Sequence, residues 1–281
     1  MAPFNHNGVM ARARILTHGG SSSLPADRDG TLRAAEAALV AAAEGSSLQE
    51  TTLRAMDVLE DDPRFNAGTG SALRGDGESI QMDAAFMAWS PTLGSFPAMF
   101  GAVACIERVR NPTRVASALA QEGASLLCGP GAIRFARERG HADHDPMTVQ
   151  ATLRYEALLR GSDTVGCVAS DGDGYAAALS SGGLTGSRPG RVGDVPLPGC
   201  GLYAGPKGAV AFTGIGEEIL RRSAAIRAYD QLAAGVPAPA VVDDIRVWFG
   251  DVEFGCILLG PDTHAGGSNR DMAWSYLERS V

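Results

Sequence analysis

The sequence lacks the features that mark secreted, membrane-spanning or nucleic-acid-binding proteins. Its five cysteines are widely spaced among 281 residues and form no Cys-x-x-Cys pair, which argues against a disulfide framework and predicts reduced, buried thiols. No apolar run approaches the ~20 residues of a transmembrane helix, and the N-terminal segment has no signal-peptide core. The net charge of −8 offers no basic face to nucleic acid or to an anionic membrane. We therefore expect a cytoplasmic protein without nucleic-acid or membrane partners.

Familiar cofactor and catalytic motifs are also missing. There is no phosphate-binding G-x-x-x-x-G-K-[ST], no G-x-G-x-x-G after a strand, no G-x-S-x-G and no H-E-x-x-H. The segment "HADHDP" (141–146) has metal-ligand residue types but lies in a polar connector, so we interpret it as a solvated linker. The segment "DGDG" (171–174) lacks the later ligands of a calcium loop and predicts a hairpin turn. No cofactor is expected to be required.

The residues that are present indicate one globular domain, 1–281, of mixed composition. Hydrophobic residues make up 45% and charged residues 20%, with 36 glycines to mark tight turns. Helices, strands, helices and strands follow one another with Asp-Gly hairpin signals. The segment 141–163 is charged, and its end is the most linker-like part of the chain. This order predicts a layered α/β fold with antiparallel hairpins rather than a βαβ repeat. Strands are expected at 12–18, 79–89, 98–106, 164–170, 175–181, 208–214, 252–260 and 271–277, and helices at 31–45, 47–62 (with a capping box from Ser47 to Glu50), 111–123, 130–140 and twice before Gly250.

The stretch "GSDTVGCVAS" (161–170) contains the residue of greatest chemical interest. Thr164 follows a polar lead-in and opens an apolar strand with small residues after it. A threonine hydroxyl is a poor nucleophile unless a base lies within hydrogen-bond reach. Its own α-amine would serve if the preceding peptide bond were cut, because an α-amine with a pKa of about 7.7–8.0 is partly neutral near pH 7. The pattern alone leaves two interpretations open, a structural threonine at a strand start and an N-terminal nucleophile.

Several longer blocks carry a resemblance to a known family. They are "THGG" (17–20), "LEDDPRFNAGTGSAL" (59–73), "QMDAAFM" (81–87), "DTVGCVA" (163–169), "SSGGLTGSRPGRVGDVPLPGCGLYA" (180–204), "FTGIGEE" (212–218) and "NRDMAWSYL" (269–277). In this order they resemble the plant-type L-asparaginase and isoaspartyl peptidase family of N-terminal-nucleophile hydrolases. The resemblance implies a four-layer αββα sandwich and an (αβ)2 oligomer. It also implies self-cleavage between Asp163 and Thr164 into an α subunit, 1–163, and a β subunit, 164–281.

The same resemblance implies roles for individual residues. Thr164 becomes the nucleophile, and its freed amine becomes the base, with Ser181 as a second hydroxyl where relatives usually have Thr. The Arg191 guanidinium would bind the α-carboxylate of an amino-acid substrate, and the Asp194 carboxylate would bind its α-ammonium group. The Thr213 hydroxyl and the Gly214 backbone would donate hydrogen bonds to the scissile carbonyl oxygen. Asn66 and Gly216 would also lie at this site. A structural sodium ion would be ringed by the backbone carbonyls of Leu59, Glu60, Asp62, Phe65, Ala67 and Thr69.

The expected activity is cleavage of β-aspartyl dipeptides and of the side-chain amide of L-asparagine, with release of L-aspartate. Two alternatives remain open on the sequence. The first is glycosylasparaginase of the same family, although those enzymes commonly carry a secretion signal. The second is an uncleaved, non-catalytic relative that binds amino acids. Ser181 and a short connector before Asp163 keep this second alternative open. Ser21 after the His-Gly-Gly turn is a further departure from the family pattern.

Overall fold

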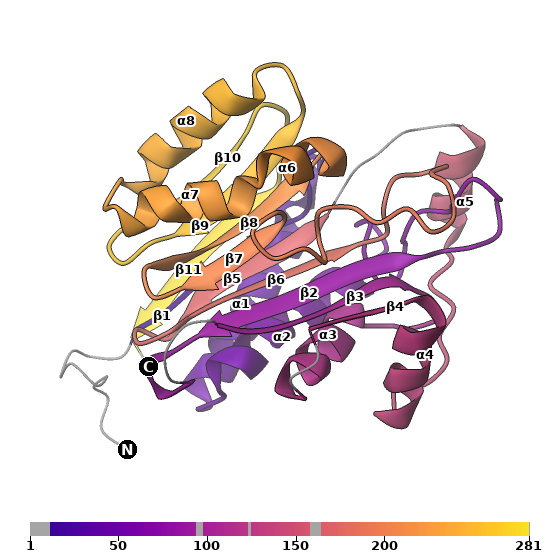
Figure 1. Cartoon of the computed structure of the whole chain (residues 1–281), viewed down its shortest axis with the longest axis horizontal. Coiled ribbons are helices and arrows are strands. Elements are labelled where there is room, and N and C mark those ends of the chain that lie inside the picture. The colour runs from indigo at the N-terminus through magenta and orange to yellow at the C-terminus, as the bar shows by residue number, and fades with distance from the viewer. Residues whose placement is uncertain (1–11, 94–97, 123–124, 158–163, 281) are drawn as a thin grey trace.

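Two β-sheets and eight α-helices make up the described part of the chain (Figure 1). The structure is a computed structural model that describes residues 12–93, 98–122, 125–157 and 164–280. The larger sheet has the order β11-β1-β5-β6-β2-β3-β4, and the smaller has the order β10-β9-β8-β7. All neighbouring strands are antiparallel except β3 and β4. The strands are β1 Arg12–His18, β2 Met82–Trp89, β3 Met99–Ile106, β4 Leu126–Cys128, β5 Val165–Ser170, β6 Tyr175–Ser181, β7 Leu202–Gly205, β8 Gly208–Gly214, β9 Phe254–Leu259, β10 His264–Ser268 and β11 Trp274–Ser280.

Helices pack on the outer side of each sheet, and the two sheets contact each other. Helices α1, α2 and α3 pack against strands of the larger sheet, whereas α7 and α8 pack against the smaller one (Figure 1). Strands β5 and β6 of the larger sheet contact β8 of the smaller sheet. The helices are α1 Arg28–Ala43, α2 Leu48–Asp61, α3 Pro112–Gln121, α4 Gly129–Glu138, α5 Val149–Glu156, α6 Gly216–Arg222, α7 Ala224–Ala233 and α8 Ala238–Phe249.

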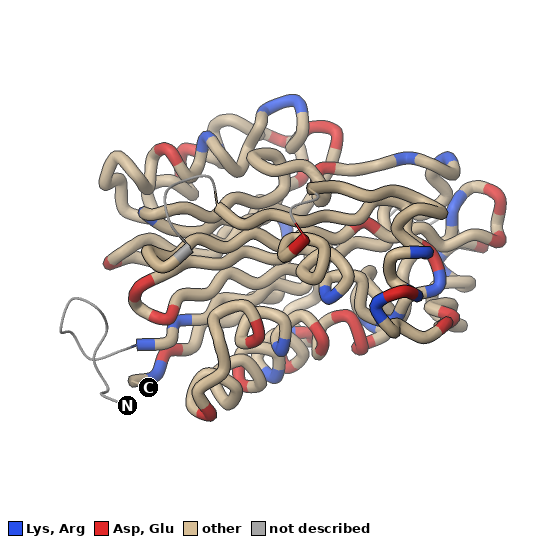
Figure 2. The backbone as a smooth tube through the Cα atoms, turned by 60° about the horizontal axis from the view of Figure 1, so that its bottom comes forward, with Lys and Arg blue, Asp and Glu red and all other residues tan. Residues whose placement is uncertain are grey.

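The central strands are buried along their whole length. Every residue of β5, β6 and β8 is buried, because helices cover one face of each sheet and the other sheet covers the second face. Such strands carry continuous apolar or small residues rather than an alternating pattern, as in "YAAALSS" of β6. Figure 2 shows the same division, since charged residues gather on helices and loops and the middle strands carry few. A residue at the start of β5 is therefore held by a rigid, enclosed strand.

Most of the elements expected from the sequence are confirmed. All eight expected strands and the helices at α1 to α4 are present within a few residues of their expected bounds, and the class is mixed α/β. Ser47 caps α2 by accepting a hydrogen bond from the Glu50 amide, although the Glu50 side chain pairs with Arg114 and Arg54 instead of closing a capping box.

Some predictions about the fold are wrong or incomplete. Three short strands, β4, β7 and β10, were not expected, because runs of three to five residues give too little pattern. The connector contains helix α5, and three helices rather than two precede Gly250. All five cysteines are free, but Cys128 is exposed and Cys200 is only partly buried, contrary to the expectation of buried thiols. Within the described residues, no helix combines the length and the apolar character needed to cross a membrane.

The hairpin turn expected at "DGDG" is confirmed, whereas "HADHDP" is only partly exposed, since Pro146 is buried and His144 contacts Thr69 at 3.1 Å. In "DGDG", the Asp171 carboxylate accepts hydrogen bonds from the amides of Asp173 (3.0 Å) and Gly174 (2.8 Å), which closes the hairpin between β5 and β6. In "HADHDP", the exposed Asp143 pairs with Arg108 and Arg137 at the surface. No group of three or more His, Cys, Asp or Glu side chains in the described ranges is arranged to hold a metal ion.

Candidate active site

Thr164 lies at the head of β5 beside a small cavity. Thr164 is one of the residues that line this cavity, and it is only 4% exposed. Six of the residues singled out in the sequence line this cavity together, although they come from four separate segments of the chain. The lining comprises Asp83, Thr164, Ser181, Gly183, Leu184, Arg191, Gly193, Asp194, Val195, Gly214 and Gly216.

Thr213 contacts Thr164 from the facing sheet. The backbone nitrogen of Thr164 donates to the Thr213 hydroxyl oxygen at 3.3 Å, and the Ser21 amide donates to the same oxygen at 3.2 Å. The Ser21 hydroxyl in turn donates to the Glu253 carboxylate at 2.6 Å. Gly214 follows at φ +133°, where an added Cβ would lie 2.5 Å from the Glu253 carbonyl oxygen, so only glycine fits there. The Thr213 hydroxyl is thus oriented by two amides, with its own proton left to donate.

Asn66 supports the cavity from behind rather than lining it. Its side-chain amide donates to the Gly183 carbonyl at 2.7 Å and accepts from the Ala72 amide at 2.8 Å. Its backbone carbonyl accepts from the Gly182 amide at 2.8 Å. The Ser181 hydroxyl accepts from the Gly183 amide at 3.1 Å, so this turn also orients the second hydroxyl of the site. Asn66 therefore acts on the turn after β6.

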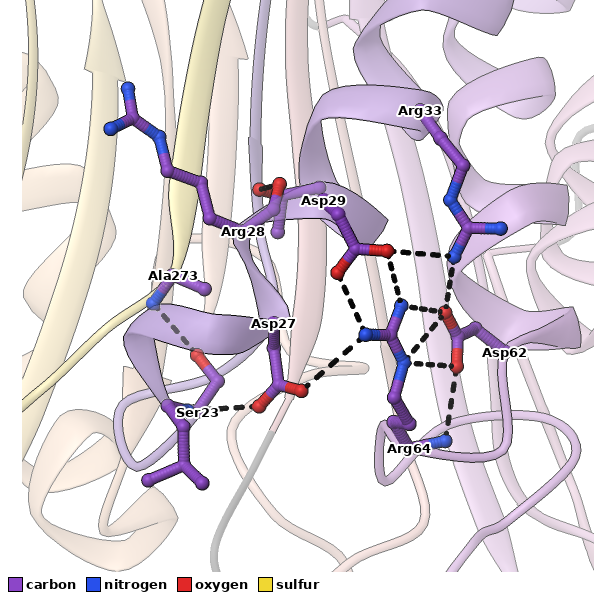
Figure 3. A network of polar contacts seen from close by, with 10 residues as sticks. Ser23, Asp27, Arg28, Asp29, Arg33, Asp62, Arg64 and Ala273 are labelled. Atoms are coloured by element: carbon purple, nitrogen blue, oxygen red, sulfur yellow. Dashed lines mark hydrogen bonds and ion pairs between the residues drawn. The ribbon is translucent and has the colours of Figure 1, made fainter.

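An ion-pair cluster anchors the loop that carries Asn66 (Figure 3). The Arg64 guanidinium lies between three carboxylates, at 2.6 Å from Asp62, 2.7 Å from Asp29 and 3.7 Å from Asp27. Arg33 reaches Asp62 from α1 at 2.9 Å. Asp27 and Asp29 belong to the start of α1, so the cluster joins the loop after α2 to the first turn of α1.

The loop after α2 brings several backbone carbonyl groups together. The Thr69 amide donates to the Glu60 carbonyl at 2.8 Å. An added Cβ on Gly68 would lie 2.4 Å from that carbonyl oxygen, and one on Gly70 would lie 3.0 Å from the Phe65 carbonyl oxygen. The Glu60 carbonyl, one of the six expected sodium ligands, thus already accepts a backbone amide. The Asp62 carboxylate pairs with Arg64, and the Asp62 carbonyl accepts from the Phe65 amide at 3.1 Å.

Arg191 and Asp194 place opposite charges at the cavity. Asp194 is 4% exposed, and its Oδ2 has no hydrogen-bond partner among the described residues. Burial raises the pKa of Asp194 to about 7. The Arg191 guanidinium forms two parallel hydrogen bonds to Glu217, at 2.9 and 2.8 Å. A Cβ on Gly216 would lie 2.7 Å from Asp194 and 3.0 Å from Arg191, so glycine keeps the space between the two charges open.

The sequence interpretation missed three buried polar residues at this site. Asp83 lines the cavity and is 1% exposed. The His18 ring abuts Gly166 of β5, where an added Cβ would lie 2.3 Å from Nε2, and burial lowers the His18 pKa to about 3, so the ring is neutral. Arg74 is fully buried beside Gly183. A charged residue inside an apolar strand, as Asp83 is in "QMDAAFM", was the available signal. Asp163 lies outside the described residues.

The sequence matches the family described as asparaginase over residues 11–163 and 159–260. It is 33% identical to a plant-type L-asparaginase from Pyrococcus furiosus, over 93% of this chain and 94% of that protein. It is 35% identical to an isoaspartyl peptidase from Escherichia coli, over 79% and 76% of the two chains. An isoaspartyl peptidase/L-asparaginase from Danio rerio is 37% identical, over 74% and 72%.

Proposed function

Because the chain belongs to the asparaginase family, we propose that it is a threonine amidohydrolase that hydrolyses L-asparagine and β-aspartyl dipeptides to release L-aspartate. The observation that carries this proposal is the cavity itself. It places the hydroxyl-bearing Thr164 beside a guanidinium and a buried carboxylate, from Arg191 and Asp194. These two charges complement the α-carboxylate and the α-ammonium of an amino acid. The names of the relatives, L-asparaginase and isoaspartyl peptidase, agree with this substrate class.

Recognition of the α-amino acid orients the side-chain carbonyl toward Thr164. The freed α-amine of Thr164 takes the hydroxyl proton, and the oxygen attacks the carbonyl carbon. The Thr213 hydroxyl and the backbone at Gly214 stabilise the oxyanion. The C–N bond then breaks, the protonated amine passes its proton to the departing ammonia or peptide amine, and an acyl-enzyme remains. Water, activated by the same amine, releases L-aspartate.

The active enzyme requires a free amine at Thr164, so we propose self-cleavage between Asp163 and Thr164. The products are subunits of residues 1–163 and 164–281. The packing of helices on both outer faces of two contacting sheets supports a four-layer αββα sandwich of the N-terminal-nucleophile hydrolase type. The processed units would pair as (αβ)2, and the five free cysteines support a reducing compartment such as the cytoplasm. A sodium ion would be held by the loop carbonyls of 59–69 and takes no part in the chemistry.

A combined assay tests the proposed function. Purified protein is aged, examined on a denaturing gel, and assayed for ammonia release from L-asparagine and for aspartate release from a β-aspartyl dipeptide. We expect two fragments in place of the 29.0 kDa chain, with activity rising in step with cleavage. A single uncut band without turnover would favour a non-catalytic amino-acid-binding relative. Turnover of a glycosylated asparagine in preference to both substrates would favour glycosylasparaginase.

Asp194 predicts a pH dependence of binding. Its carboxyl is neutral below its pKa of about 7 and ionised above it, and only the ionised form attracts an ammonium group. The affinity for L-aspartate should therefore fall as the pH drops through 7, approaching about tenfold per pH unit. Succinate lacks the ammonium group and serves as the reference ligand. A constant ratio of the two affinities between pH 5 and pH 8, measured by competitive inhibition, would contradict this role for Asp194.

Glu217 competes with the substrate for Arg191. Its carboxylate forms both hydrogen bonds to the guanidinium and is 46% exposed. Exposed ion pairs contribute roughly 0–1 kcal/mol, so a Glu217→Gln substitution should lower the KM for L-asparagine by about two- to fivefold with kcat unchanged. Steady-state kinetics measure this effect. A tenfold rise in KM would instead mean that Glu217 is needed to orient Arg191.

A further inference from the structure

The strand pair β2–β3 contains a bulge next to the cavity. Met82 is opposite Ile106 and Ala84 is opposite Val103, so Asp83 faces two residues of β3 rather than one. One of these is Cys105, which has φ +48° although it is not glycine. Left-handed backbone at a bulky residue is uncommon and persists where the surroundings enforce it. Bulges beside active sites often redirect particular groups.

The bulge directs the Cys105 amide at the Asp83 carboxylate. Asp83 Oδ1 accepts from the Cys105 amide at 2.9 Å, and Oδ2 accepts from the Gly193 amide at 3.0 Å. Gly193 lies between Arg191 and Asp194 in the segment that carries both charges. The Cys105 thiol also donates to the Arg191 carbonyl, with a sulfur–oxygen distance of 3.7 Å. Both oxygens of a buried carboxylate are thus used to hold backbone.

Gln81 makes a parallel contact on the other side of Arg191. Its side-chain oxygen accepts from the Gly190 amide at 2.7 Å, and its amide group donates to Glu107 at 2.9 Å. Gln81 directly precedes β2, and Asp83 is the second residue of that strand. Gln81 and Asp83 therefore hold the amides of Gly190 and Gly193, which flank Arg191 on the chain.

Arg74 supplies a positive charge behind this arrangement. It is fully buried, donates to the Ser187 hydroxyl at 2.7 Å and donates to the Gln81 carbonyl at 2.5 Å. Its charge favours the ionised form of Asp83 and opposes the effect of burial, which raises the pKa of Asp83. Hydrogen bonds of Arg74, Gln81 and Asp83 therefore join the start of β2, strand β3 and the segment 187–193.

We propose that Gln81 and Asp83, with the bulged Cys105, are positioning residues that set the placement of Arg191 and Asp194 and thereby the affinity for the substrate's α-amino and α-carboxylate groups. This inference rests on the proposed function, because it assumes that Arg191 and Asp194 bind those groups. Each oxygen of Asp83 accepts a backbone amide, one from β3 and one from the segment that carries Arg191 and Asp194. Asp83 thus acts on binding through the segment that it holds.

An Asp83→Asn substitution tests the inference with a minimal change of shape. The amide offers one acceptor and one donor group, so one of the two backbone amides loses its partner and faces another donor. We expect the KM for L-asparagine to rise roughly 10- to 100-fold, with kcat within about threefold of the parent and cleavage at Thr164 retained. A merely structural role would lower the fraction of active enzyme, and hence the apparent kcat, and would leave KM unchanged.

Asp171→Asn is the matched control. Asp171 also accepts two backbone amides, but both bonds go to one oxygen, which asparagine retains, and the turn lies at the end of the β5–β6 hairpin opposite Thr164. Its KM should equal that of the parent. If Asp83→Asn fails to fold, Gln81→Met is the second variant. It removes one bond to the segment and should raise KM about three- to tenfold, and an unchanged KM there overturns the inference.

Calorimetric titration with L-aspartate separates this inference from the proposed function. If the parent binds L-aspartate and Asp83→Asn binds it at least tenfold more weakly, the inference is supported. If the parent binds L-aspartate and Asp83→Asn binds it equally well, the inference is wrong and the proposed function stands. If the parent does not bind L-aspartate, the proposed function fails and the inference fails with it.

Discussion

Replacing Thr164 by alanine is expected to leave a single uncut chain of 29.0 kDa that releases neither ammonia nor aspartate. The substitution removes the attacking hydroxyl for both the self-cleavage and the hydrolysis. Removing the nucleophile of a hydrolase lowers kcat by roughly 10⁴- to 10⁶-fold. Alanine also removes only a hydroxyl and a methyl group from a residue at the start of a buried strand, so the fold should persist. A denaturing gel and an ammonia assay on the same sample measure both effects.

Thr164→Ser is the control for this experiment. Serine keeps the hydroxyl but loses the methyl group that restricts χ1, so cleavage and turnover should continue at reduced rates. Cleavage of the serine variant alongside an intact alanine variant would assign the chemistry to the hydroxyl. Release of aspartate by uncut Thr164→Ala protein would show that another group is the nucleophile.

Loss of the Arg191 guanidinium should have the second largest effect. An Arg191→Ala variant leaves Asp194 and Glu217 as unbalanced negative charges beside the site of the substrate's α-carboxylate. Truncation of one partner of a buried, hydrogen-bonded charge pair costs roughly 2–5 kcal/mol. The expected loss in kcat/KM for L-asparagine is therefore about 10²- to 10³-fold, mostly through KM. Cleavage at Thr164 should continue, because Arg191 holds the substrate and not the scissile peptide.

Arg191→Lys provides the graded control. Lysine keeps the positive charge but cannot form two parallel hydrogen bonds to a carboxylate. Its kcat/KM should lie between those of the parent and the alanine variant. A kcat/KM for Arg191→Ala within threefold of the parent would exclude Arg191 from recognition of the α-carboxylate and would favour a structural ion pair with Glu217.

Several site residues could be found from the sequence because they lie in long, ordered blocks. Thr164, Ser181, Thr213 and Gly214 stand at the ends of strands whose composition was readable, and these strands formed as expected. Their strand positions explain why Thr164, Ser181 and Gly214 line one cavity and why Thr213 contacts Thr164. The role of Asn66 was harder to predict, since its contacts with Gly183 and Ala72 depend on how the loop after α2 returns to β6.

Asp83 and Glu217 could not be placed from the sequence. Asp83 lies 110 residues before Gly193, and their contact depends on how β2 pairs with β6 and how the segment after β6 returns over it. Glu217 faces Arg191 only because α6 begins directly beyond β8 at the cavity. The periodicity of the sequence does not indicate either contact, because tertiary packing decides which side chains of distant segments meet.

The sequence by itself determined most of the strands and helices, the mixed α/β class, the family and the presence of a hydroxyl residue immediately before β5. These properties follow from local composition and from the order of blocks along the chain. Only the tertiary structure decided the electrostatics of the site: the burial that raises the pKa of Asp194, the pairing of Arg191 with Glu217, and the bulge that joins Cys105 to Asp83. Burial of a side chain and the distance between two charges both depend on segments that are remote in sequence. They are therefore set only when the two sheets pack together.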